Sequence, residues 1–153
     1  MAEVTLRPVT AADLDFVYRC QTDCRPGFDS ATEAPSRFEL WMFVNGYRHD
    51  LEGQGQLLFV IEGGGHRVGT LEFADYEPDV RTASVGIYIT PGQRGRGYAR
   101  AALDAACELS RELALVGLTA LIAPANAPSQ ALFSACGFVR ETDQLWRLTA
   151  NDC

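Results

Sequence analysis

Two arginines and two glycines alternate at Arg94, Gly95, Arg96 and Gly97, between an apolar β-branched stretch (84–89) and a helix-like pattern. The first N–H groups of a helix have no partner within it, and the aligned peptide dipoles favour negative charge there. Glycines let the backbone approach an anion closely, and arginines add positive charge. The turn therefore predicts a phosphate-binding site, with a plain strand-to-helix connection as the alternative.

The common nucleotide-binding loops do not fit this turn. An ATP-binding loop ends in Gly-Lys-Ser/Thr, whereas Gly97 is followed by Tyr98 and Ala99. A dinucleotide fingerprint needs a third glycine where this chain has Arg100. The phosphate is therefore expected to belong to another kind of ligand.

The turn resembles the acetyl-CoA loop of the GNAT N-acetyltransferase superfamily. The signature of that loop, Gln/Arg-x-x-Gly-x-Gly/Ala, is matched by Arg94, Gly97 and Ala99, and the preceding strand ends at Thr90–Pro91 as in the family. A second family motif is matched about thirty residues later by Asn126, Ser129, Leu132, Phe133, Gly137 and Phe138. Residues 6–18 are similar to the first strand and helix of the family, so the resemblance spans most of the chain.

The resemblance implies that acetyl-CoA is the co-substrate and that its pantetheine arm lies between two splayed parallel strands, 83–89 and 118–123. Backbone groups of the first strand would pair with the arm as an added strand does, and loop amides would hold the pyrophosphate. Asn126 would bond the arm or its loop, and Phe133 would pack beside the thioester. The acetyl-CoA contacts implied are Ile87, Tyr88, Ile89, Arg94, Gly95, Arg96, Gly97, Tyr98, Ala99, Arg100, Asn126, Ser129 and Phe133.

Acetylation of an amine needs a neutral amine, a polarised thioester carbonyl and a proton for the departing thiolate. The backbone amide near Ile89 resembles the oxyanion donor of the family. Glu72 is predicted to be the general base, because Val68, Thr70 and Glu72 stand at every second position of a strand beside the cleft. The alternative is that Glu72 is an exposed strand carboxylate; Asp75 and Glu77 follow as further candidates for the base.

Many family members protonate the thiolate with a tyrosine at the position of Phe133, whose ring has no proton to give. Tyr88, Ser129 or a water molecule is predicted to replace it. Unassisted departure is the other route, since an ordinary thiol pKa of about 8.5 makes the thiolate a fair leaving group. Leu121 stands where members that acetylate protein α-amines carry a catalytic Glu, which disfavours a ribosomal-protein substrate.

Hydrophobic periodicity and turn signals predict an alternating series of strands and helices. Trp41, Phe43 and Tyr47 are expected to belong to the core rather than to an acceptor pocket. The expected strands are 4–7, 57–62, 68–73, 83–89, 118–123 and one or two within 138–148; the expected helices start after Thr10 and Ser36, span 98–115 up to Gly117, and span 129–135; and 25–36 is a loop.

These elements and the resemblance predict an α/β (α+β), three-layer, GNAT-like fold. About four helices would cover a central mixed, mostly antiparallel sheet of six or seven strands that contains the splayed parallel pair. The 153 residues are expected to form a single acetyltransferase domain, 1–153.

The composition narrows the class of partner. The net charge of -7 argues against nucleic acid or a membrane surface and permits a cationic amine as substrate. The five cysteines lack paired spacing, so neither a disulfide framework nor a metal site is indicated. With no signal-peptide pattern and no apolar run of membrane-spanning length, a cytoplasmic protein is expected.

The function predicted is that of an N-acetyltransferase, which moves an acetyl group from acetyl-CoA to a primary amine of a small molecule or peptide by direct attack in a ternary complex. Polyamines, amino sugars, antibiotics and peptide amines all remain open as acceptors. A catalytically silent acyl-CoA-binding sensor and an interaction protein with an adventitious anion are the alternatives. A homodimer built through the C-terminal strands is compatible with the resemblance.

Overall fold

The computed structural model describes residues 3–23 and 36–149, so most of the predicted loop at 25–36 lies outside the described residues. No helix within these ranges is both long and apolar enough to cross a bilayer. The elements are β1 (Thr5–Pro8), the 3-10 helix η1 (Ala11–Asp13), α1 (Leu14–Asp23), α2 (Arg37–Asn45), α3 (Leu51–Gln54), β2 (Leu57–Gly63), β3 (His66–Glu77), β4 (Thr82–Ile89), η3 (Pro91–Gln93), α4 (Tyr98–Glu112), β5 (Gly117–Leu121), α5 (Ala127–Ala135), β6 (Val139–Arg140) and β7 (Leu145–Thr149).

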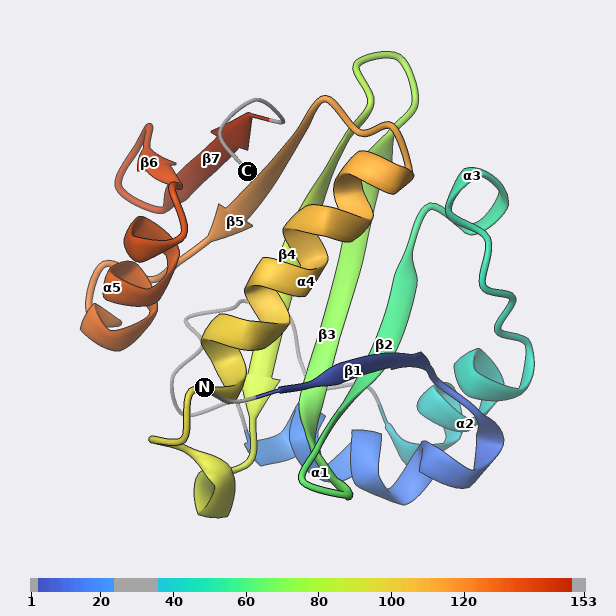
Figure 1. The fold of residues 1–153 in the computed structure, drawn as a ribbon. Coiled ribbons are helices and arrows are strands. Elements are labelled where there is room, and N and C mark those ends of the chain that lie inside the picture. Colours follow the sequence, from blue (N-terminus) through green and yellow to red (C-terminus); the bar gives the residue numbers. More distant parts are fainter. Residues whose placement is uncertain (1–2, 24–35, 150–153) are drawn as a thin grey trace.

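The strands form one mixed sheet in the order β1-β2-β3-β4-β5-β7-β6 (Figure 1). Strands β2, β3 and β4 make an antiparallel meander, and β4 pairs with β5 in parallel. Parallel neighbours need a long crossover, which α4 supplies. The predicted sheet with its parallel pair is therefore confirmed.

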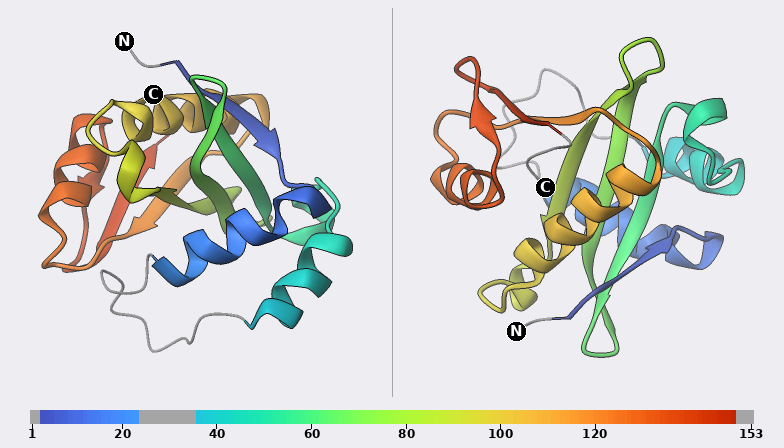
Figure 2. Two further views of the ribbon diagram at one scale, coloured as in Figure 1. Left: turned by 90° about the horizontal axis from the view of Figure 1, so that it is seen from below. Right: turned by 45° about the horizontal axis from the view of Figure 1, so that its top comes forward.

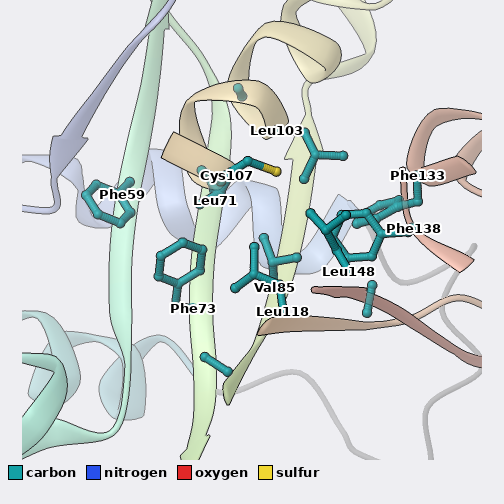
Figure 3. Close-up of a cluster of buried hydrophobic side chains, with 14 of the residues drawn as sticks. Phe59, Leu71, Phe73, Val85, Leu103, Cys107, Leu118, Phe133, Phe138 and Leu148 are labelled. Carbon is teal, nitrogen blue, oxygen red and sulfur yellow. The ribbon is translucent and has the colours of Figure 1, made fainter. Parts of the chain in front are cut away.

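Helices cover both faces of the sheet, which gives the three predicted layers. Helix α4 lies on one face, and α1 and α2 lie on the other (Figure 2). The larger apolar cluster fills the α4 side and runs from Phe59 on β2 to Phe133 on α5 (Figure 3). The smaller cluster joins α1 and α2 to the opposite face through residues such as Val17, Leu40 and Val60.

Local signals explain where several elements begin and turn. The predicted pairing of Thr10 with Asp13 is present as a capping box, and Ser36 forms a second capping box with Glu39 at the start of α2. The β2–β3 hairpin turns at Gly64 and Gly65, whose φ angles are 61° and 81°. Two successive positive φ angles match the twist of a tight hairpin, and glycine adopts them without steric cost.

The predicted end of the long helix was wrong. Helix α4 ends at Glu112, and Ala114 supplies the left-handed residue with φ 58°, while Leu115 N–H bonds Ser110 O at 2.9 Å. Gly117 instead begins β5, where a β-carbon would lie 2.9 Å from the Leu148 carbonyl oxygen. The glycine is therefore needed for a close strand contact and not for the helix cap.

The aromatic stripe on α2 is only partly in the core. Phe43 and Tyr47 pack against the smaller cluster, as predicted, but Trp41 is 48% exposed and stacks on the exposed Phe38. Leu121, expected inside a buried strand, is 68% exposed because side chains alternate along a strand: Ala120 and Ile122 face the α4-side cluster and Leu121 faces the other way.

Asp13 is a buried carboxylate that ties β1, η1 and β3 together. It accepts two hydrogen bonds of 2.9 Å from the Arg7 guanidinium, one of 2.8 Å from Thr10 N–H, and one of 3.4 Å from Arg67. Burial alone would raise the pKa of Asp13, but the bonds from Arg7 and Thr10 outweigh it and hold that pKa at about 2. The folded protein thus favours the ionised form.

Replacing Asp13 by Asn is expected to lower the free energy of unfolding by about 2–4 kcal/mol, because two arginines lose their buried partner. Wild-type stability should also fall as the pH drops from about 4, where an unfolded Asp protonates, towards 2. Urea unfolding between pH 7 and pH 2 measures both effects. Asp15→Asn is the matched control, since the exposed ion pair of Asp15 with Arg37 should change stability by under about 1 kcal/mol. Equal losses in the two variants would contradict the assignment.

Candidate active site

The predicted phosphate loop has the backbone that an anion site needs. Gly95 and Gly97 have φ angles of 78° and 83°, and Gly97 is the N-cap of α4 with no side chain to cap it. The first bond within the helix runs from Ala101 N–H to Gly97 O at 3.1 Å. The N–H groups from Tyr98 to Arg100 therefore lack helical acceptors, and the helix dipole adds partial positive charge beside them.

The three arginines of this region lie in different places. Arg96 and Arg100 line a groove of about 1000 Å³ beside the start of α4 and the β2–β3 turn, and Arg100 is 3.4 Å from Asp104. Arg94 turns back onto β4, where its Nε donates to Ile89 O at 2.9 Å and its guanidinium carbon lies 5.4 Å from the centre of the Tyr88 ring. Only the first two flank the uncapped helix start.

Strands β4 and β5 separate where the resemblance places the pantetheine arm. Their paired residues run from Thr82 with Gly117 to Ser84 with Thr119, and no pairing between them continues past Ser84 in the described chain (Figure 1). Beyond that point β4 continues to Ile89, and β5 continues towards α5. The edge of β4 from Val85 onward thus faces a gap in the sheet.

The β3–β4 register shows which residues of β4 face that gap. Thr90 N–H bonds Val68 O at 2.9 Å, and Tyr88 is paired with Thr70 two residues earlier. Hydrogen-bonded pairs alternate along an antiparallel ladder, so the backbone groups of Tyr88 point to β3, whereas those of Ile87 and Ile89 point towards β5. Ile87 and Ile89 are therefore placed to pair with an extended ligand, and Tyr88 is placed to contact one only through its side chain.

Helix α5 follows β5, on the side of the gap away from β4 (Figure 1). Asn126 is its N-cap and accepts a hydrogen bond of 3.2 Å from Ser129 N–H, so the two predicted residues lie together. The Phe133 ring is buried and packs edge-on against Phe138, with ring centres 4.9 Å apart (Figure 3). Phe133 is therefore part of the core that joins α5 to α4.

Glu72 lies on the face opposite α4. It alternates with Leu71 and Phe73, which belong to the α4-side core, and it is paired with Gly86 of β4. A β-carbon at Gly86 would lie 3.5 Å from both Cγ and Oε1 of Glu72, so the carboxylate lies directly over β4. Tyr88 is two residues from Gly86 and shares this face, so the structure brings two of the predicted catalytic side chains to one side of the sheet.

The surroundings of Glu72 favour its protonated form. Burial raises the pKa of Glu72, and the negative charge of Asp75 raises it further. Asp75 has a positive φ of 51° and accepts a hydrogen bond of 3.4 Å from Ser84 Oγ. A carboxylate with a raised pKa removes protons near neutral pH more effectively than an ordinary one, so this site suits a general base.

Sequence reasoning missed Gly86, which creates the space for the Glu72 carboxylate. A glycine inside a strand often marks a close approach, and that signal was available in the sequence. Within the described ranges, no group of three or more His, Cys, Asp or Glu side chains is arranged to hold a metal ion.

The comparisons agree with this geometry. A family model described as the acetyltransferase (GNAT) domain matches residues 3–139. No curated protein matches the sequence. The family match makes the protein an acyltransferase. The chain belongs to the GNAT acetyltransferase family, which confirms the resemblance, and it uses acetyl-CoA as its acetyl donor.

Similar solved structures include the spermidine N-acetyltransferase of Vibrio cholerae in complex with CoA and spermine, at 23% identity and a TM-score of 0.84, over 98% of this chain and 97% of that one. A mutant of that enzyme, SpeG, has 25% identity and a TM-score of 0.82 over 97% and 95%. A dodecameric structure of the Vibrio cholerae spermidine N-acetyltransferase in an intermediate state has 22% identity and a TM-score of 0.81, over 97% of this chain and 95% of that one.

Proposed function

We propose that this acetyltransferase moves the acetyl group of acetyl-CoA directly to a primary amine of a small cationic molecule, with Glu72 as the general base. One observation carries the proposal: the Glu72 carboxylate lies over Gly86 of β4. The other edge of β4 is the edge that faces the gap towards β5, where acetyl-CoA would lie. The cofactor-binding and catalytic assignments of the sequence analysis, with the exception of Arg94, form part of this proposal.

The residues present fit acetyl-CoA. The N–H groups at the start of α4 would hold the pyrophosphate, with Arg96 and Arg100 alongside. The outward backbone groups of Ile87 and the outward N–H of Ile89, whose carbonyl already accepts from Arg94, would pair with the pantetheine arm. Acetyl-CoA supplies the activated acyl group, and Ile89 N–H is the predicted donor to its carbonyl oxygen.

Glu72 would take the proton that makes the amine nucleophilic. An aliphatic ammonium is charged at neutral pH and cannot attack until it loses that proton. A carboxylate close to a second one, Asp75, attracts the ammonium and then accepts its proton. The base and the cation-binding group are therefore the same acidic pair.

An aliphatic polyamine is the acceptor class that this acidic pair favours. The neighbour SpeG is a spermidine N-acetyltransferase, and one of its structures holds spermine. The net charge of -7 also favours approach of a polycation. Polyamines are thus the first acceptors to test.

The thiolate is proposed to be protonated by Tyr88, Ser129 or water, or to leave unassisted, since the phenyl ring of Phe133 has no proton. The Tyr88 hydroxyl is buried on the same face as Glu72. Ser129 lies half-buried at the start of α5, across the gap from β4.

The test is release of free thiol from acetyl-CoA with a panel of polyamines, amino sugars, aminoglycosides, amino acids and short peptides. Turnover confined to polyamines or another small amine is the expected result. Acetyl-CoA binding in calorimetry without turnover of any amine would contradict the proposal and favour the silent acyl-CoA sensor.

A further inference from the structure

Arg94 is directed to the strand that precedes it and not to the start of α4. Its Nε donates a hydrogen bond of 2.9 Å to Ile89 O, and its guanidinium carbon lies 5.4 Å from the Tyr88 ring centre. Arg96 and Arg100 line the groove beside the helix start, and Arg94 does not. The charge that flanks the phosphate site therefore comes from the other two arginines.

The hydrogen bond from Arg94 to Ile89 O helps to hold the peptide plane between Ile89 and Thr90. Ile89 is buried at 8% exposure, and its carbonyl points towards β5, where no strand among residues 3–23 and 36–149 pairs with it. The N–H of the same peptide plane belongs to Thr90 and bonds Val68 O at 2.9 Å. Both ends of the plane are held, by β3 on one side and by Arg94 on the other, so the plane cannot rotate without breaking a hydrogen bond.

We propose that Arg94 is a positioning residue that fixes the backbone of Ile89 at the open edge, and not a ligand of the pyrophosphate. This inference rests on the proposed function in one respect, since Ile89 N–H is taken as the donor to the thioester oxygen. The Ile89–Thr90 plane meets the plane that carries the Ile89 N–H at the Ile89 Cα, so holding the first plane limits the rotations by which that N–H could change direction. Preorganised donors stabilise developing charge without reorganisation, so loss of Arg94 would act on turnover more than on binding.

Two substitutions separate the hydrogen bond from the charge. In Arg94→Gln, the side-chain Nε2 stands at the same distance along the chain as Nε of arginine, so the donor stays and the charge is lost. In Arg94→Lys, a methylene stands there, so the charge stays and the donor is lost. Arg96→Gln is the control, because it removes a loop charge without touching Ile89.

The experiment measures kcat, the acetyl-CoA affinity by calorimetry, and the hydrogen-exchange rate of Thr90 N–H in each variant. Arg94→Gln is expected to keep kcat and the slow exchange. Arg94→Lys should lower kcat about fivefold to tenfold, exchange faster at Thr90, and keep its acetyl-CoA affinity. Arg96→Gln should weaken acetyl-CoA binding with exchange unchanged.

A phosphate ligand would give the opposite pattern, with weakened acetyl-CoA binding in Arg94→Gln and near-normal behaviour in Arg94→Lys. That pattern would overturn the inference. An equal loss of kcat in Arg94→Gln and Arg94→Lys, or no loss of kcat in either, would overturn it as well. The exchange rate needs no turnover. If the wild type acetylates no amine, the proposed function fails while the exchange data still decide the role of Arg94.

Discussion

Glu72→Gln should lower kcat about 100-fold or more with the best amine, while acetyl-CoA binds as in the wild type. The amide keeps the size and much of the polarity of the carboxylate but cannot accept the proton of an ammonium, and general-base catalysis contributes about 10²–10⁴ to rate. The site over Gly86 is otherwise unchanged. Steady-state kinetics at saturating acetyl-CoA and calorimetry of acetyl-CoA binding measure the two effects separately.

The pH dependence gives a second signature of the same residue. Burial and Asp75 raise the pKa of Glu72, so kcat/KM should rise with pH through a value above the ordinary carboxyl pKa of about 4.3. Between the ordinary carboxyl pKa and the raised pKa of Glu72, the Glu72 carboxyl holds its proton more strongly in the folded state than in the unfolded state. Ionisation of Glu72 therefore lowers the free energy of unfolding as the pH rises through this range. Glu72→Gln should therefore lose the acidic limb of the rate profile and remain at least as stable as the wild type at pH 8.

Glu77→Gln is the matched control, because Glu77 lies on the same strand but is exposed at its end. Its kcat should stay within about twofold of the wild type, as for a surface change. A normal rate in Glu72→Gln would remove Glu72 from the catalytic mechanism. A large loss in Glu77→Gln would instead assign the base to Glu77.

The parts that sequence predicted well depend on neighbours along the chain. Pro91 and the glycines at 95 and 97 interrupt the periodicity, and this ends β4 and starts α4 where predicted. The predicted helix between the apolar strands 83–89 and 118–123 likewise indicated that these strands pair in parallel, as β4 and β5 do. Each of these signals acts within a few residues of its effect.

What sequence could not predict depends on register across the sheet. Glu72 meets Gly86 only because of the way β3 pairs with β4. Trp41 carries the same apolar signal as a core residue, but its exposure depends on how α2 packs. The direction of Arg94 depends on which carbonyl the open edge leaves for it, and no local pattern encodes that.

Gly97→Asp should reduce acetyl-CoA affinity by far more than any other single change in the loop. The new carboxylate would stand at the N-cap of α4, where the uncapped N–H groups are proposed to hold the pyrophosphate. It would fill the space of the pyrophosphate and repel the negative charge of the phosphates. The fold should survive, because Asp is a favourable N-cap residue, although φ of 83° adds about 1–2 kcal/mol of strain for a side chain. Calorimetry with acetyl-CoA and urea unfolding measure binding and stability.

Gly97→Asn separates charge from bulk, because Asn has the shape of Asp and tolerates a positive φ equally well. Both variants should lose the same stability, but Gly97→Asp should bind acetyl-CoA on the order of 100-fold more weakly than Gly97→Asn, since only the former repels the phosphates. Added salt should narrow that difference, because screening weakens repulsion between exposed charges. Equal affinities in the two variants would mean that the phosphates lie elsewhere, and unchanged affinity in both would exclude the loop from the acetyl-CoA site.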